Sequence, residues 1–116
     1  MDSTLNTVLA QEPACDASQV PSDGSVMACR VNGRQVALAR HTQGDETIVA
    51  FDSLCPHMQA PFRFGRVVNG EVICPWHFFR FNVLTGETVA CDKSLMKIRS
   101  YPVQVIEGKV YVQVTD

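Results

Sequence analysis

The chain has 116 residues, which is enough for one hydrophobic core and too few for two. Apolar residues make up 46% of it and charged residues 19%, so the composition is that of a folded globular protein and not of a disordered chain. Ten basic against twelve acidic residues give a net charge of -2, which excludes the concentrated positive field that nucleic-acid binding requires.

The first sixteen residues, 1–16, contain Asp2 and Glu12 but no lysine or arginine, and they lack the apolar stretch of a secretion signal. We expect them to form a flexible tail and residues 17–116 to form the single domain. No apolar run approaches the roughly 20 residues that a membrane-spanning helix needs, so no membrane span is expected. Without an export signal, the expected location is the cytoplasm.

Two Asn-Gly pairs, Asn32-Gly33 and Asn69-Gly70, each separate two β-prone runs and predict tight hairpins. No apolar 3.6-residue period persists for three turns, so helices should be short or absent. The predicted class is all-β, a small sandwich or barrel. The predicted strands lie at 26–31, 34–39, 47–52, 66–68, 71–74, 79–82, 86–90, 103–106 and 110–114, and the last two turn around residues 107–109.

Five cysteines are an odd number in a chain without an export signal, so structural disulfides explain them poorly. Cys55-Pro56-His57, then sixteen residues, then Cys74-Pro75-Trp76-His77 place one thiol and one imidazole on each of two tight loops. Two thiolates and two imidazoles can converge on one inorganic centre, and the prolines stiffen the loops because they restrict φ. The candidate ligands are therefore Cys55, His57, Cys74 and His77.

Two other uses of these four residues remain at this point. A structural zinc site of the Cys2His2 type takes the same donors. Zinc sites more often keep like ligands together, as C-x-x-C and H-x-x-H, whereas here each loop carries one of each kind. A nucleophilic Cys/His enzyme is the second alternative, but nothing marks one cysteine as a nucleophile with a third orienting group.

Over residues 26–114 the sequence resembles the Rieske family. The likeness is densest at 55–86, where CPH, CPWH, Phe81 and Thr85-Gly86 fall at the family's spacing. The resemblance implies a small Rieske-like β-sandwich or barrel with two cluster-binding loops. It also implies one 2Fe-2S cluster in which two cysteines hold one iron and two histidines hold the other, redox-active iron. These ligands would be Cys55 and Cys74, and His57 and His77.

Four positions indicate which kind of Rieske protein the chain resembles. High-potential members join the two loops by a disulfide, and the corresponding residues here are Ala60 and Trp76. The same members donate serine and tyrosine hydroxyl groups to cluster sulfurs, and here those positions are Phe79 and Phe81. Because such hydrogen bonds favour the reduced state, the resemblance implies a potential near the low end of the Rieske range, about -150 mV. In these features the chain is similar to the ferredoxins of bacterial multicomponent oxygenases.

The resemblance thus implies a one-electron carrier, not an enzyme, that passes electrons from a flavin- or iron-sulfur-containing reductase to a terminal oxygenase. Of three histidines only His41 is left after the two ligands, too few for the 2-His-1-carboxylate iron site that activates oxygen. Two alternatives stay open. One is a tightly bound accessory subunit of a larger oxidoreductase, such as a nitrite reductase small subunit, and the other is a zinc interaction module.

The remaining residues of interest have simpler expectations. Cys15, Cys29 and Cys91 should be small buried thiols, and His41 an exposed loop residue. A second group could form either an apolar collar around the histidines or ordinary packing between the loops: Met58, Pro61, Phe62, Trp76 and Phe78. Three arginines against one glutamate should make the same end of the molecule mildly basic: Arg63, Arg66 and Arg80 against Glu71.

Overall fold

The computed structural model of the chain describes residues 13–42, 44, 46–56, 59–76, 79–89 and 97–114. This part is built from short antiparallel strands, which confirms the predicted all-β class. Helical structure in it is limited to two 3-10 turns, η1 (Ala17–Gln19) and η2 (Phe62–Phe64). No helix among the described residues is long and apolar enough to cross a membrane.

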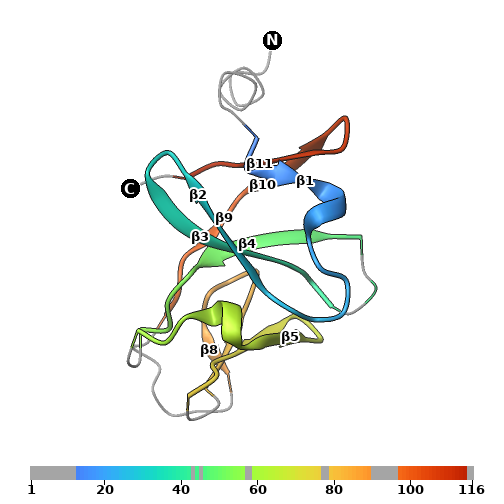
Figure 1. Cartoon of the computed structure of the whole chain (residues 1–116). Helices are drawn as coiled ribbons and strands as arrows, with labels where there is room; N and C mark the ends of the chain where they lie inside the picture. Colours follow the sequence, from blue (N-terminus) through green and yellow to red (C-terminus); the bar gives the residue numbers. More distant parts are fainter. Residues whose placement is uncertain are drawn as a thin grey trace.

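The strands form three antiparallel sheets, which follow one another along the length of the molecule in Figure 1. The sheet at one end has the order β1 (Cys15–Asp16), β11 (Lys109–Val112), β10 (Val103–Ile106). The middle sheet has the order β2 (Met27–Val31), β3 (Arg34–Arg40), β4 (Ile48–Asp52), β9 (Ser100–Tyr101). The sheet at the other end has the order β5 (Arg66–Val68), β6 (Glu71–Ile73), β7 (Arg80–Asn82), β8 (Thr88–Val89).

The middle sheet is buried on both faces and separates two hydrophobic cores. Successive side chains of a strand point to opposite faces, so the apolar run of β3 supplies Ala37 and Ala39 to the first core and Val36 and Leu38 to the second. The first core comprises Val26, Ala37, Ala39, Val49, Phe51, Cys55, Ala60, Phe62, Val67, Val72, Cys74, Phe81, Val83 and Ile98. The second core comprises Val20, Val31, Val36, Leu38, Ile48, Ala50, Tyr101, Val110 and Val112.

The predicted Asn-Gly hairpins are both present. Asn32 and Gly33 have φ of 52° and 80°, and Asn69 and Gly70 have φ of 48° and 81°, as a two-residue hairpin turn requires. The turn of the last hairpin consists of Glu107 and Gly108 alone, because Lys109, the first residue of β11, already pairs with Ile106, the last residue of β10. Its turn is therefore one residue shorter than the predicted 107–109.

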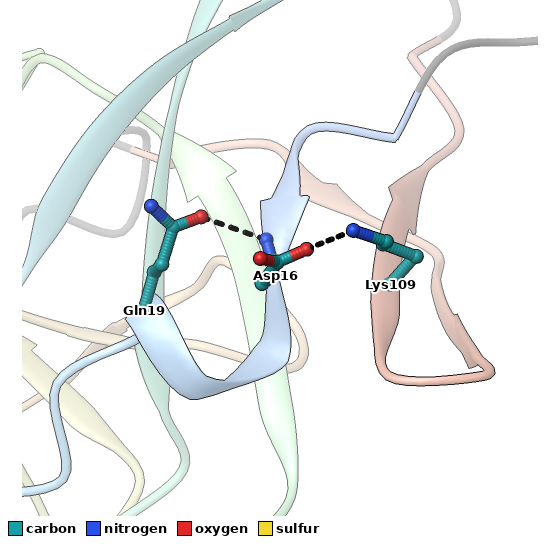
Figure 2. A network of polar contacts seen from close by, with 3 residues as sticks. All are labelled: Asp16, Gln19 and Lys109. Carbon is teal, nitrogen blue, oxygen red and sulfur yellow. Dashed lines mark hydrogen bonds and ion pairs between the residues drawn. The ribbon is translucent and has the colours of Figure 1, made fainter.

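The end of the expected tail, 1–16, belongs to a sheet. Cys15 lies opposite Val110, and Asp16 lies opposite Lys109. Figure 2 shows how Asp16 holds this edge: its N–H donates to Gln19 Oε1 at 2.8 Å, and its carboxylate accepts a hydrogen bond from the Lys109 ammonium. A two-residue strand has no alternation that the sequence could reveal. Residues 1–12 lie outside the described residues.

Candidate metal centre

The first ligand loop follows β4 and is closed by its own backbone. The Cys55 N–H donates to the Ala60 carbonyl at 2.8 Å, and the Gln59 N–H donates to the Cys55 carbonyl at 2.6 Å. The two residues that flank this loop, Leu54 and Pro61, form an isolated antiparallel β-bridge. The cysteine therefore stands at the entrance of a short loop whose two ends are held side by side.

The second ligand loop joins β6 to β7 and repeats this arrangement. The Cys74 N–H donates to the Phe79 carbonyl at 2.7 Å, so in each loop the cysteine amide bonds the carbonyl five residues further on. The Trp76 N–H also donates to Cys74 Sγ at 3.4 Å. Hydrogen bonds to ligand sulfurs are one of the factors that set the reduction potential of an iron-sulfur cluster.

Both cysteines are buried at the same end of the fold. Cys55 and Cys74 are fully shielded from solvent and belong to the first core, together with Phe62 and Phe81. The four cysteines that the structure describes, Cys15, Cys29, Cys55 and Cys74, are all thiols. Two buried thiols on two similar loops fit the sulfur ligands of one iron.

The histidine half of the predicted site, His57 and His77, lies outside the described residues, as do Met58 and Phe78. Within the described part of the chain no group of three or more His, Cys, Asp or Glu side chains could hold a metal ion. The complete four-residue ligand set therefore stays a prediction, and the structure bears on its two cysteines.

The cysteines outside the loops have different surroundings. Cys15 and Cys29 are partly buried and pack against the second core. Burial raises the pKa of the Cys29 thiol to about 11, with a smaller contribution from Cys15. Such a thiol is almost entirely protonated at neutral pH and is a poor metal ligand. Cys91 lies outside the described residues.

His41 differs from the expectation of an exposed loop residue. Its ring lies against the turn between β5 and β6: a Cβ atom added at Gly70 would come within 2.8 Å of His41 Nε2. The backbone carbonyl of His41 also accepts a hydrogen bond from the Gly70 N–H at 2.7 Å. His41 is thus partly buried between the middle sheet and the sheet of the second loop.

The apolar residues around the loops divide between the core and the surface. Phe62 is fully buried, whereas Trp76 is 48% exposed. Phe64, which the sequence analysis did not single out, is 67% exposed, and the Arg63 guanidinium lies 4.8 Å from its ring centroid. Phe62 and Phe64 belong to one 3-10 turn, in which side chains two positions apart point in different directions, and no pattern in the sequence distinguishes the buried ring from the exposed one.

Two of the three arginines at this end have an acidic neighbour, Glu71 for Arg80 and Asp23 for Arg66. Arg63, Arg66 and Arg80 are exposed, and Arg80 forms an ion pair with Glu71 at 3.5 Å. Beside the second loop lies a hollow of about 480 Å³ that contains Arg66 and the exposed Phe64 ring. It is lined by Ser25, Phe64, Gly65, Arg66, Ile73, Cys74 and Pro75.

An antiparallel fold with two buried cysteines on two loops of the same construction is the arrangement expected of a small iron-sulfur protein. Residues 10–102 match the Rieske [2Fe-2S] domain, and the chain belongs to this family, whose members bind an iron-sulfur cluster of the 2Fe-2S type.

Individual relatives are components of oxygenase systems. The chain is 34% identical over 91 residues to the ferredoxin component of the naphthalene 1,2-dioxygenase/salicylate 5-hydroxylase systems of Ralstonia sp, covering 78% of this chain and 84% of the relative. It is 32% identical over 93 residues to the naphthalene 1,2-dioxygenase ferredoxin component of Pseudomonas putida, covering 80% and 86%. A chain in the solved complex of reduced oxygenase and oxidised ferredoxin of carbazole 1,9a-dioxygenase has a TM-score of 0.73 and 28% identity, covering 88% of this chain and all of that one.

Proposed function

We propose that this protein is a one-electron carrier that accepts electrons from a flavin- or iron-sulfur-containing reductase and passes them to a terminal oxygenase. The observation that carries the proposal is the pair of buried thiols, Cys55 and Cys74, on two loops of the same construction in a chain that spans most of the length of ferredoxin components. The two relatives described above are ferredoxin components of their oxygenase systems.

The proposed cofactor is a single 2Fe-2S cluster. Cys55 and Cys74 would hold one iron, and His57 and His77 the other, which is the usual division of ligands in Rieske centres. The cluster supplies the redox chemistry, and the chain supplies the thiolates, the Trp76 N–H directed at Cys74 Sγ, and an apolar core behind the loops. The thiols Cys15 and Cys29 fit a reducing compartment, and we propose the cytoplasm.

Substitution of the loop cysteines tests the ligand set. Cys55→Ser and Cys74→Ser should each lose iron and acid-labile sulfide, because an alcohol is a much weaker iron ligand than a thiolate. Cys29→Ser is the matched control and should keep both, since the Cys29 thiol has a pKa of about 11 and packs against the second core. The measurements are iron, zinc and sulfide content, with the EPR spectrum of the dithionite-reduced protein.

Each outcome of that measurement has a meaning for the function. Two irons and two sulfides per chain, with a mean g clearly below the free-electron value, support a cluster with mixed histidine and cysteine ligands. Zinc in place of iron would contradict the proposed electron-carrier function and would favour the alternative of a zinc interaction module. Gel filtration with a reductase and an oxygenase separates a dissociating carrier from a permanently bound accessory subunit.

Phe81→Tyr should raise the reduction potential. Phe81 is fully buried in the first core with both loop cysteines. The alignment with high-potential Rieske proteins, which carry a tyrosine at this position, implies that an added hydroxyl would reach the sulfur of a cluster cysteine. A hydrogen bond to a charged group contributes roughly 1.5–3 kcal/mol, and about a third of it should differ between the oxidised and reduced states. With about 59 mV per 1.36 kcal/mol for one electron, the expected rise is roughly 20–45 mV. A titration that finds an intact cluster with an unchanged or lower potential would contradict this account.

A further inference from the structure

The two ligand loops are similar in construction, but the residues that lead into them are held by different contacts. Asp52 and Glu71 each stand three residues before a loop cysteine. Glu71 makes a 3.5 Å ion pair with Arg80, a residue of the neighbouring strand of its own hairpin. Asp52 instead contacts a segment that is 47 to 49 residues away in the sequence.

Asp52 is joined to this distant segment by three hydrogen bonds. Its N–H donates to the Arg99 carbonyl at 3.0 Å. Its carboxylate accepts from the Arg99 N–H at 2.8 Å through Oδ2 and from the Tyr101 hydroxyl at 2.7 Å through Oδ1. Both carboxylate oxygens are thus used, and hydrogen bonds to a charged acceptor are among the stronger ones in proteins.

The partners of Asp52 are themselves well anchored. Tyr101 is 5% exposed and belongs to the second core, and Ile98, next to Arg99, is buried in the first core. Burial raises the pKa of the Tyr101 phenol, and the Asp52 carboxylate raises it further, while Arg34 acts against this rise. The hydroxyl therefore remains a hydrogen-bond donor across neutral pH. Asp52 ties the end of β4 to a segment packed in both cores.

From Asp52 a series of backbone contacts leads to the ligand. The Phe62 N–H donates to the Ser53 carbonyl at 2.9 Å, Leu54 bridges Pro61, and the Cys55 N–H donates to Ala60. Beside this stretch lies a hollow of about 320 Å³, lined by Arg34, Gln35, Asp52, Ser53, Leu54, Cys55, Pro56 and Gln59. Because this side of the loop is open, the position of the loop depends on the contacts of residues 52–55.

We propose that Asp52 is a positioning residue of the cluster site: its carboxylate holds the first ligand loop, and with it Cys55, by tying the end of β4 to Arg99 and Tyr101. The second loop needs no such residue, because adjacent strands of one hairpin hold both of its ends. The proposal deepens the proposed function, since it rests on Cys55 as a cluster ligand.

Three variants test the proposal in the iron-loaded protein. Asp52→Asn keeps the shape of the side chain but removes its charge, so the bonds to Arg99 and Tyr101 lose their ionised acceptor. Tyr101→Phe removes one of the bonds without a change of charge. Glu71→Gln is the matched control, since it removes the same charge at the same distance in sequence from the other loop cysteine. Amide hydrogen exchange of the two loops is followed by mass spectrometry, with the EPR spectrum of each reduced variant.

Asp52→Asn should speed exchange in the first loop, where the Cys55 and Gln59 amides lie, by about tenfold, as expected when hydrogen bonds to a charged acceptor become bonds to a neutral one. Tyr101→Phe should give a smaller increase, and both variants should broaden the EPR lines. Exchange at Cys74 in the second loop should stay unchanged, and Glu71→Gln should alter neither loop nor the EPR lines.

Equal acceleration in both loops, or unchanged exchange in the first loop of Asp52→Asn and Tyr101→Phe, would overturn the proposal. So would the same EPR broadening in Glu71→Gln, since it would show a general effect of charge. The failure of the proposed function looks different: the unsubstituted protein would then lack iron and sulfide, while the exchange pattern of the variants would still report on the Asp52 bonds.

Discussion

Gly86→Ala is expected to lower the free energy of unfolding by about 3 kcal/mol or more. Gly86 has φ of 80°, a conformation that costs alanine about 1–2 kcal/mol. An added Cβ would also lie 1.9 Å from the Ile98 carbonyl oxygen, which is backbone and cannot rotate away. The same two residues are joined by a hydrogen bond from the Ile98 N–H to the Gly86 carbonyl at 2.9 Å. The substitution therefore has to separate β7–β8 from the segment that enters β9.

Gly33→Ala is the matched control for this prediction. Gly33 has the same φ of 80°, but nothing lies within 4 Å of the position that its Cβ would take. It should therefore show only the backbone cost, about 1–2 kcal/mol. Thermal unfolding of both variants at one scan rate measures the difference, at roughly 4–8 °C for each kcal/mol in a domain of this size. Equal midpoints for the two variants would mean that the contact with Ile98 is soft.

Phe62→Ala should cost about 3–5 kcal/mol, as is typical when a buried phenylalanine is truncated. The Phe62 ring packs edge-on against Phe51 and Phe81, with ring centroids 5.7 Å and 5.9 Å apart. It thereby connects β4, which precedes the first ligand loop, to β7, which follows the second. Its loss should leave a cavity in the first core, and the iron should be released faster to a chelator.

Phe64→Ala provides the comparison, because Phe64 belongs to the same 3-10 turn but is 67% exposed. Surface substitutions away from special features usually change stability by less than about 0.5 kcal/mol. The two variants are compared by thermal unfolding midpoint and by the rate of iron release. A midpoint for Phe62→Ala as high as that for Phe64→Ala would contradict the central place of Phe62 in the core.

Local chemistry made part of the fold predictable. Asn32-Gly33 and Asn69-Gly70 adopt the positive φ values that their residue types favour, and the strands on either side follow directly. The strands β1 and β9 were missed. Each has two residues, too few to show a period, and each forms because a distant partner lies beside it: β11 for β1, and β4 for β9.

The candidate site, too, was predictable from the sequence only in part. The spacing of Cys55, His57, Cys74 and His77 indicated an inorganic centre, because ligand chemistry depends on residue type and short loops keep near neighbours together. The histidines lie outside the described residues, so their part stays a prediction. The exposure of Phe64 and the partial burial of His41 could not be inferred, since each depends on which element packs against it.

The sequence by itself determined the all-β class, the Asn-Gly hairpins and the two cysteine loops, since all of these follow from residue types within a few positions of one another. Only the tertiary structure decided that the middle sheet is buried on both faces, that Gly86 but not Gly33 touches backbone, and that Asp52 bonds to Arg99 and Tyr101. These contacts join residues far apart in the chain. No local pattern encodes them, because they arise when separate strands pack around common cores.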